Sequence, residues 1–157
     1  MELIYQLKYH RGVHLAGELG KLAAEAFDDS RLVEARAKRW PLVPVPLHCG
    51  RLRTRHFNQA AEIARALGRE VDLPVLPALK RIRATGTQTR LTRAQRLSNL
   101  KGAFALTRVG HRFAAEKPAG VVLVDDVFTT GSTVDECART LRRAGIQKVI
   151  VVTVMRG

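Results

Sequence analysis

The residues best suited to chemistry lie in one stretch of the chain, which reads VVLVDDVFTTGST from position 121 to position 133. Two adjacent carboxylates, Asp125 and Asp126, follow four apolar residues. Ionised carboxylates accept hydrogen bonds, so they suit a vicinal diol or, through water, a hydrated divalent cation. After them come small and mostly hydroxylated residues: Thr129, Thr130, Gly131, Ser132 and Thr133.

The elements around this stretch predict where it lies in a fold. An apolar run as short as residues 121–124, rich in β-branched residues, is typical of a buried strand of a parallel sheet. A helical pattern begins at about Thr133, so the segment between lies at the carboxyl edge of the sheet, where open α/β sheets bind ligands. Gly131 allows close approach of a ligand, and amides at a helix start bind anions.

A phosphate cradle next to two carboxylates predicts a site for ribose 5-phosphate. The alternative that requires no ligand is a strand that ends in an Asx turn before a capped helix. The pair of aspartates alone is compatible with this alternative, whereas the full thirteen-residue pattern favours the site.

Length and composition predict one globular domain over residues 1–157. Apolar residues make up 46% of the chain, which is ordinary for a globular protein. The sequence has no apolar run of about 18 residues and no secretory leader pattern at its start, so we expect a cytoplasmic protein without membrane insertion. Cys49 and Cys137 are too few and too far apart for a structural zinc site.

The net charge of the chain is unusually high. Lysine and arginine number 27 against 14 acidic residues, a formal net charge of +13. Such a balance points to polyanionic partners, namely polyphosphates, nucleic acid or anionic surfaces, although it is also compatible with an arginine-rich solvated surface.

Periodicity and caps predict the remaining elements. Residues 1–40 read as helical, with Leu15, Leu19, Leu22, Ala23, Ala26 and Phe27 on one face, and within them a second short helix capped at residues 28–30 runs through Arg39. The other expected helices are 59–67 (capped by Asn58 and closed by Gly68) and 133–144 (closed by Gly145). The expected strands are about four residues within 42–46, then 79–82, 121–124 and a buried strand at 148–154. Residues 111–120 read as a polar connection.

Two strongly basic segments interrupt these elements. Residues 47–57 carry Arg51, Arg53 and Arg55 and no acid, so guanidinium groups there could bind a second anion beside the phosphate site. Residues 80–101 are also basic throughout, and polar enough to predict a mobile, hairpin-like excursion from the fold. A solvated loop without function is the alternative for this second segment.

The motif at 121–133 resembles the phosphoribosyl pyrophosphate (PRPP) motif of the type I phosphoribosyltransferases. With VPVPLHCGRLRTRHFNQA and RIRATGTQTRLTRAQRLSNLKGAF, the chain resembles the ComF family, bacterial competence-associated proteins with a phosphoribosyltransferase-like domain. The resemblance implies a mainly parallel central sheet flanked by helices, with a flexible basic hood loop. A homodimer is expected by analogy with this fold class.

The resemblance also implies roles for individual residues. Asp125 and Asp126 would hold the ribose hydroxyls and a magnesium ion, possibly through water, and Thr129–Thr133 the 5-phosphate. The pyrophosphate-loop residues would be Arg51, Arg53 and Arg55, and the flexible-loop residues Arg83, Thr85, Gln88, Arg96 and Asn99. Lys8 and Tyr9 match a recurring Lys-Tyr pair near the start of the family's domain.

The chain departs from the family in two respects. Many members carry a cysteine-rich zinc-binding segment before the domain, which is absent from this sequence; either the chain belongs to a shorter branch of the family or it begins after that segment. The family's pyrophosphate loop usually reads Arg-Gly-Phe-Asn-Gln, whereas His56 here replaces the glycine and restricts the backbone.

Three functions are compatible with these features. The first is an enzyme that binds PRPP with magnesium and transfers phosphoribose to or from a nitrogenous acceptor in DNA uptake or utilisation. The second is a non-catalytic competence factor that binds single-stranded DNA. The third is a PRPP-sensing regulator that has the same ligand site but no turnover.

Overall fold

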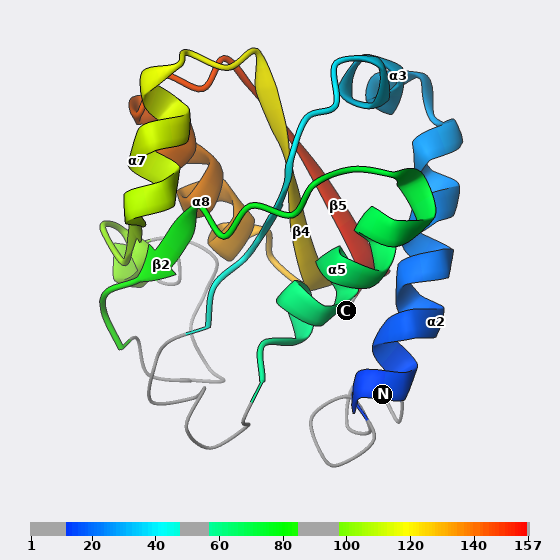
Figure 1. The fold of residues 1–157 in the computed structure, drawn as a ribbon. Coiled ribbons are helices and arrows are strands. Elements are labelled where there is room, and N and C mark those ends of the chain that lie inside the picture. Colours follow the sequence, from blue (N-terminus) through cyan, green and yellow to red (C-terminus); the bar gives the residue numbers. More distant parts are fainter. Residues whose placement is uncertain (1–11, 48–56, 85–97, 157) are drawn as a thin grey trace.

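The computed structural model describes residues 12–47, 57–84 and 98–156. The predicted α/β class is confirmed, because a parallel sheet with strand order β1-β4-β5 lies between helices (Figure 1). Its strands are β1 (Leu42–Pro44), β4 (Gly120–Phe128) and β5 (Lys148–Arg156). The helices are α2 (Gly12–Ala24), η1 (Glu25–Asp28), α3 (Ser30–Ala37), α5 (Gln59–Val71), α7 (Arg108–Ala115) and α8 (Ser132–Arg143).

A second, antiparallel pair of strands forms the base of the basic excursion. β2 (Leu79–Arg81) pairs with β3 (Phe104–Leu106), with Lys80 opposite Ala105. The chain therefore leaves and rejoins the fold at neighbouring points, as the sequence predicts. The excursion itself, residues 85–97, lies outside the described residues.

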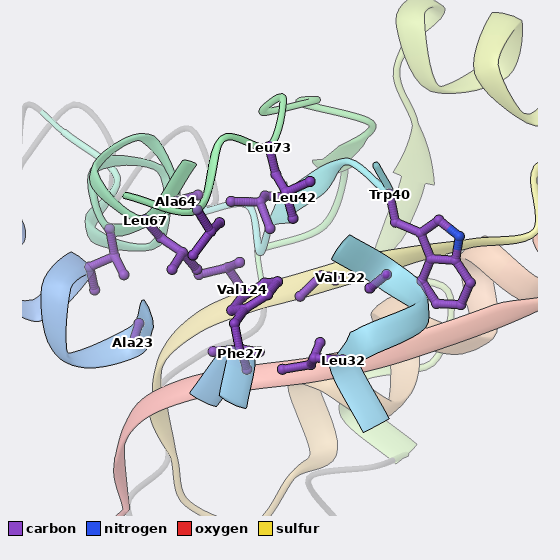
Figure 2. Close-up of a cluster of buried hydrophobic side chains, with 14 of the residues drawn as sticks. Ala23, Phe27, Leu32, Trp40, Leu42, Ala64, Leu67, Leu73, Val122 and Val124 are labelled. Atoms are coloured by element: carbon purple, nitrogen blue, oxygen red, sulfur yellow. The ribbon is translucent and has the colours of Figure 1, made fainter. Parts of the chain in front are cut away.

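Strand β4 divides the interior into two apolar clusters because successive side chains of a strand point to opposite faces. Val122 and Val124 pack with Leu42 of β1 and with residues of α2, α3 and α5. Figure 2 shows this cluster, with Phe27, Leu32 and Trp40 closing it from the N-terminal segment. Val121 and Leu123 pack instead with residues of α8, among them Leu141.

Several boundaries differ from the sequence prediction for identifiable reasons. Gly68 does not end its helix, because α5 continues to Val71 and Asp72 supplies the left-handed cap (φ +53°). Gly68 instead allows the backbone at Leu73 to pack closely against α5, since a Cβ atom at position 68 would lie 2.7 Å from the Leu73 carbonyl oxygen. Residues 108–115 form helix α7 rather than a connection, and the Thr107 side chain caps it by accepting from the Gly110 amide.

Three further features differ from the sequence prediction. β4 runs through the acidic pair to Phe128, because β5 continues to pair with it there. Strand β5 is only partly covered, and Val152 is its one buried residue. Leu22, expected on the apolar face of its helix, is 50% exposed.

Two glycines of α2 offer a matched test of helix packing. At Gly20 a Cβ atom would lie 2.4 Å from Ala66 Cβ on α5, whereas nothing lies within 4 Å of one at Gly17. We expect Gly20→Ala to lower the free energy of unfolding by about 1–3 kcal/mol through overpacking. Gly17→Ala should raise it by about 0.5–1 kcal/mol, because alanine is the better helix former. Urea denaturation measures both, and equal effects would contradict the close approach of α2 and α5.

Candidate functional site

The segment between β4 and α8, called the cradle below, is a tight turn that leads into a helix start, as the sequence predicts for an anion site. Gly131 has φ +76° and immediately precedes the first residue of α8, Ser132. A side chain at Gly131 would also meet the Phe128 ring at 2.8 Å, so both conformation and space require glycine. Thr130 and Ser132 join their hydroxyls at 3.0 Å, and the amide groups at the start of α8 are available for an anion.

A small pocket of about 20 Å³ opens over this turn. Five of the predicted site residues line it: Asp125, Thr129, Gly131, Ser132 and Thr133. The structure thus brings one carboxylate of the acidic pair together with most of the predicted phosphate-binding residues.

The acidic pair lies at the end of the apolar part of β4. The Asp126 amide donates to Asp125 Oδ1 at 3.0 Å, and the Val127 amide donates to Asp126 Oδ1 at 2.9 Å. Burial is the larger cause, and the negative charge of Asp126 the smaller one, that together raise the pKa of Asp125 to about 8. Near neutral pH the Asp125 carboxyl therefore holds a proton, so it can both donate and accept hydrogen bonds with a ligand's hydroxyl groups.

The first basic segment is rooted next to this pair. The Val45 amide, just after β1, donates to the Val124 carbonyl at 2.9 Å. At the far end of the segment, Asn58 caps α5 through the Ala60 amide and donates to the Val45 carbonyl at 3.0 Å. Both ends of the segment are thus fixed beside the residue that precedes Asp125, although Arg51, Arg53 and Arg55 themselves lie outside the described residues.

The second basic segment is closed at its root in a similar way. Arg83 Nη1 donates to the Lys101 carbonyl at 2.9 Å, so this predicted loop residue bridges the two ends of the excursion. Asn99 is exposed. Lys8, Tyr9, Thr85, Gln88 and Arg96 lie outside the described residues, as does His56.

Glu136 is a residue that the sequence reading missed. It is only 2% exposed, and its Oε1 accepts from the Gly102 amide at 2.8 Å. Because Glu136 lies one turn into α8, it ties the helix that begins at the cradle to the returning end of the second basic segment. A single glutamate in a helix carries no sequence signal for this role, and only its burial shows it.

The described residues contain no cluster of three or more histidine, cysteine or acidic side chains that could hold a metal ion. The acidic pair fits a magnesium ion that brings other ligands with it, because a cation would relieve the repulsion that raises the Asp125 pKa. Magnesium typically keeps several waters and binds through one or two carboxylates together with substrate phosphates. Cys137 is buried, and burial raises the pKa of its thiol well above the usual value, so it is unreactive.

Comparison with known proteins agrees with this geometry. Residues 57–157 match the phosphoribosyl transferase domain family. Competence protein F of Haemophilus influenzae is 34% identical over 95% of this chain and 64% of its own length. The DNA utilization protein YhgH of Escherichia coli K12 is 37% identical over 95% of this chain and 63% of its own length. The resemblance noted in the sequence is thereby confirmed, and the chain spans somewhat less than two thirds of these relatives.

In the described ranges, no helix is both long and apolar enough to cross a lipid bilayer.

The raised pKa of Asp125 predicts how the stability of the protein depends on pH. Between about pH 4 and 8 the folded protein holds a proton on Asp125 that the unfolded chain, with a pKa near 3.8, releases. The contribution of Asp125 to the free energy of unfolding is therefore greatest below about pH 4 and decreases as the pH rises to about 8. Asp125→Asn mimics the protonated form, so without ligand or divalent cations its melting temperature should exceed that of the wild type increasingly across this window.

Asp28→Asn serves as the control, because Asp28 is an exposed carboxylate of η1. A pH trend that Asp28→Asn also shows is a general effect of removing a carboxylate and is subtracted from that of Asp125→Asn. A constant difference for Asp125→Asn after this subtraction would show that Asp125 is ionised in the folded protein.

Proposed function

The chain belongs to the phosphoribosyl transferase domain family, and from this premise we propose that it binds PRPP and transfers phosphoribose to or from a nitrogenous acceptor. One observation carries the proposal. The cradle at Gly131 and Ser132, the carboxyl of Asp125 and the root of the first basic segment at Val45 converge at one edge of the parallel sheet. A ligand with a phosphate at one end, a diol in the middle and a second anionic group matches this order.

The roles follow from the chemistry of each group. The amides and hydroxyls of residues 129–133 bind the 5-phosphate, and Asp125 and Asp126 orient the ribose hydroxyls. Arg51, Arg53 and Arg55 neutralise the pyrophosphate through guanidinium contacts. A magnesium ion held at the acidic pair, directly or through water, would supply further positive charge to the pyrophosphate oxygens.

In the transfer direction, the bond from the anomeric carbon to the pyrophosphate oxygen breaks and the pyrophosphate leaves with the electron pair. The acceptor nitrogen forms the new bond to the anomeric carbon and releases its proton. Preorganised positive charge at the leaving group lowers the barrier, because negative charge develops there. The site must also exclude water, which competes as acceptor.

The names of the relatives support a setting in DNA uptake or utilisation. Competence protein F and YhgH are named for competence and DNA utilisation respectively. We propose that the ligand site of this chain serves such a process. A PRPP sensor would share this site, and it would differ from the enzyme by binding PRPP without releasing pyrophosphate in the presence of any acceptor.

Calorimetric titration of PRPP with magnesium tests the binding step. Hydrogen bonds to charged groups contribute about 1.5–3 kcal/mol each, so Asp125→Ala/Asp126→Ala should weaken binding by about 100-fold or more. The matched control is Glu25→Ala/Asp28→Ala, which removes two exposed carboxylates of η1 and should leave binding unchanged. Absence of binding to the wild type at millimolar PRPP would refute the proposal.

Single-stranded DNA binding is a second candidate, favoured by the net charge of +13. Contact with three or more phosphates predicts that log affinity for an oligothymidylate falls against log salt with a slope of about −2 or steeper. Fluorescence anisotropy over a salt series measures the slope, with and without PRPP. A flat response, or no binding at low salt, would exclude this function.

A further inference from the structure

Strand β5 has the sequence of an interior strand but the position of an edge strand. Its residues, KVIVVTVMR, include apolar side chains at consecutive positions, which is typical of strands covered on both faces. Within the described ranges β5 pairs only with β4. Its neighbour β4 buries every residue from Val121 to Val124 completely, whereas Val151 of β5 is 38% exposed.

Long, apolar, unprotected edges are uncommon in natural proteins, because their free backbone groups pair with other chains. Strand β5 spans nine residues and has none of the usual protections within it, since it contains no proline and only its ends, Lys148 and Arg156, are charged. Such an edge is suited to accepting a further strand.

The surface is hollow on both sides of this edge. One hollow is lined by Ala26 and Leu32 of the N-terminal segment together with Ile150 and Thr153. The other lies between β5 and α8 and includes Val149. Val151 lines both hollows. An added strand would direct its side chains alternately into the two hollows, since its residues alternate between faces.

The hollow beside α8 is strongly basic. Its lining includes Arg139, Arg142 and Arg143, with Asp135 as the one carboxylate. Arg139 lies 3.7 Å from the buried Glu136, and in the part of the chain that the structure describes neither Arg142 nor Arg143 forms an ion pair. A partner that fills this hollow must therefore bring negative charge.

We propose that the β5 edge, defined as β5 together with these three arginines, docks an extended acidic segment of a partner protein as an additional strand. The proposal is independent of PRPP binding. A second copy of this chain fits poorly, because antiparallel pairing of two β5 strands about a two-fold axis places the arginines of both copies on the same face of the joint sheet. A nucleic acid could meet the arginines, but it lacks the regular amide and carbonyl groups that a free strand edge pairs with.

A designed probe tests the proposal: a fluorescent peptide of alternating valine and glutamate, matched in length to β5, with a valine–lysine peptide as its counterpart. We expect only the acidic peptide to bind, and hydrogen–deuterium exchange of residues 148–156 to slow when it does. Val151→Glu places a charge of the peptide's own sign on the edge, and Arg142→Glu/Arg143→Glu reverses the charge of the hollow. Each should weaken binding about tenfold or more.

Matched controls separate edge pairing from general charge effects. Val151→Thr keeps a strand-forming side chain, and Arg108→Glu/Arg112→Glu reverses two exposed arginines on α7. Both should bind the acidic peptide like the wild type. The proposal is overturned if the peptide does not bind at about 1 mM, a concentration that detects even weak pairing, or if it binds without protecting β5. It is also overturned if an oligothymidylate protects β5 instead, or if protection appears with protein concentration alone through dimerisation.

Discussion

The complete burial of one strand is the constraint on which the rest of the structure depends. Val121, Val122, Leu123 and Val124 are wholly inaccessible, and they supply side chains to both apolar clusters. Burying a valine or leucine side chain contributes roughly 1.5–3 kcal/mol, so this short run holds both helical layers against the sheet. It also fixes where β4 meets the edge, and hence where Asp125 and the Gly131 turn lie. Asp125 follows directly on this run and is itself partly buried, which makes its ionisation costly.

The sequence predicted most of the elements that bear on the site. The apolar run before Asp125, the helix after Gly131 and the cap at Asn58 all lie where the pattern indicates. These signals are local, since they depend on side-chain periodicity and on hydrogen bonds within a few residues. The predicted end of a helix at Gly68 was wrong because a glycine can serve close packing as well as helix termination, and only the approach of the Leu73 carbonyl distinguishes the two. Helix α7 was missed because its apolar face is short.

The candidate site was less predictable than the fold. Residue types sufficed for the shape of the turn, since the positive φ of Gly131 and the helix that begins at Ser132 depend on glycine and small hydroxylated residues that are adjacent in the sequence. They did not show that Glu136 binds the Gly102 amide, nor that Arg83 bonds to the Lys101 carbonyl, because both contacts join residues far apart in sequence. The partial exposure of β5 could not be predicted from the sequence either. Apolar residues show that a strand is suited to burial, but the elements packed around it determine how much of it is buried.

The hydrogen bonds that join the two ends of each basic segment have an evolutionary consequence. Asn58 joins the first segment's end to Val45, and Arg83 joins the second segment's start to Lys101. Because each segment is sealed at its own base, substitutions or insertions within it need not shift the strand ends that carry the cradle. Doubling the length of such a loop costs only about 0.6 kcal/mol in closure entropy. The architecture is therefore modular: lineages can exchange the two basic segments while they retain the turn at Gly131 and the strand ends beside it.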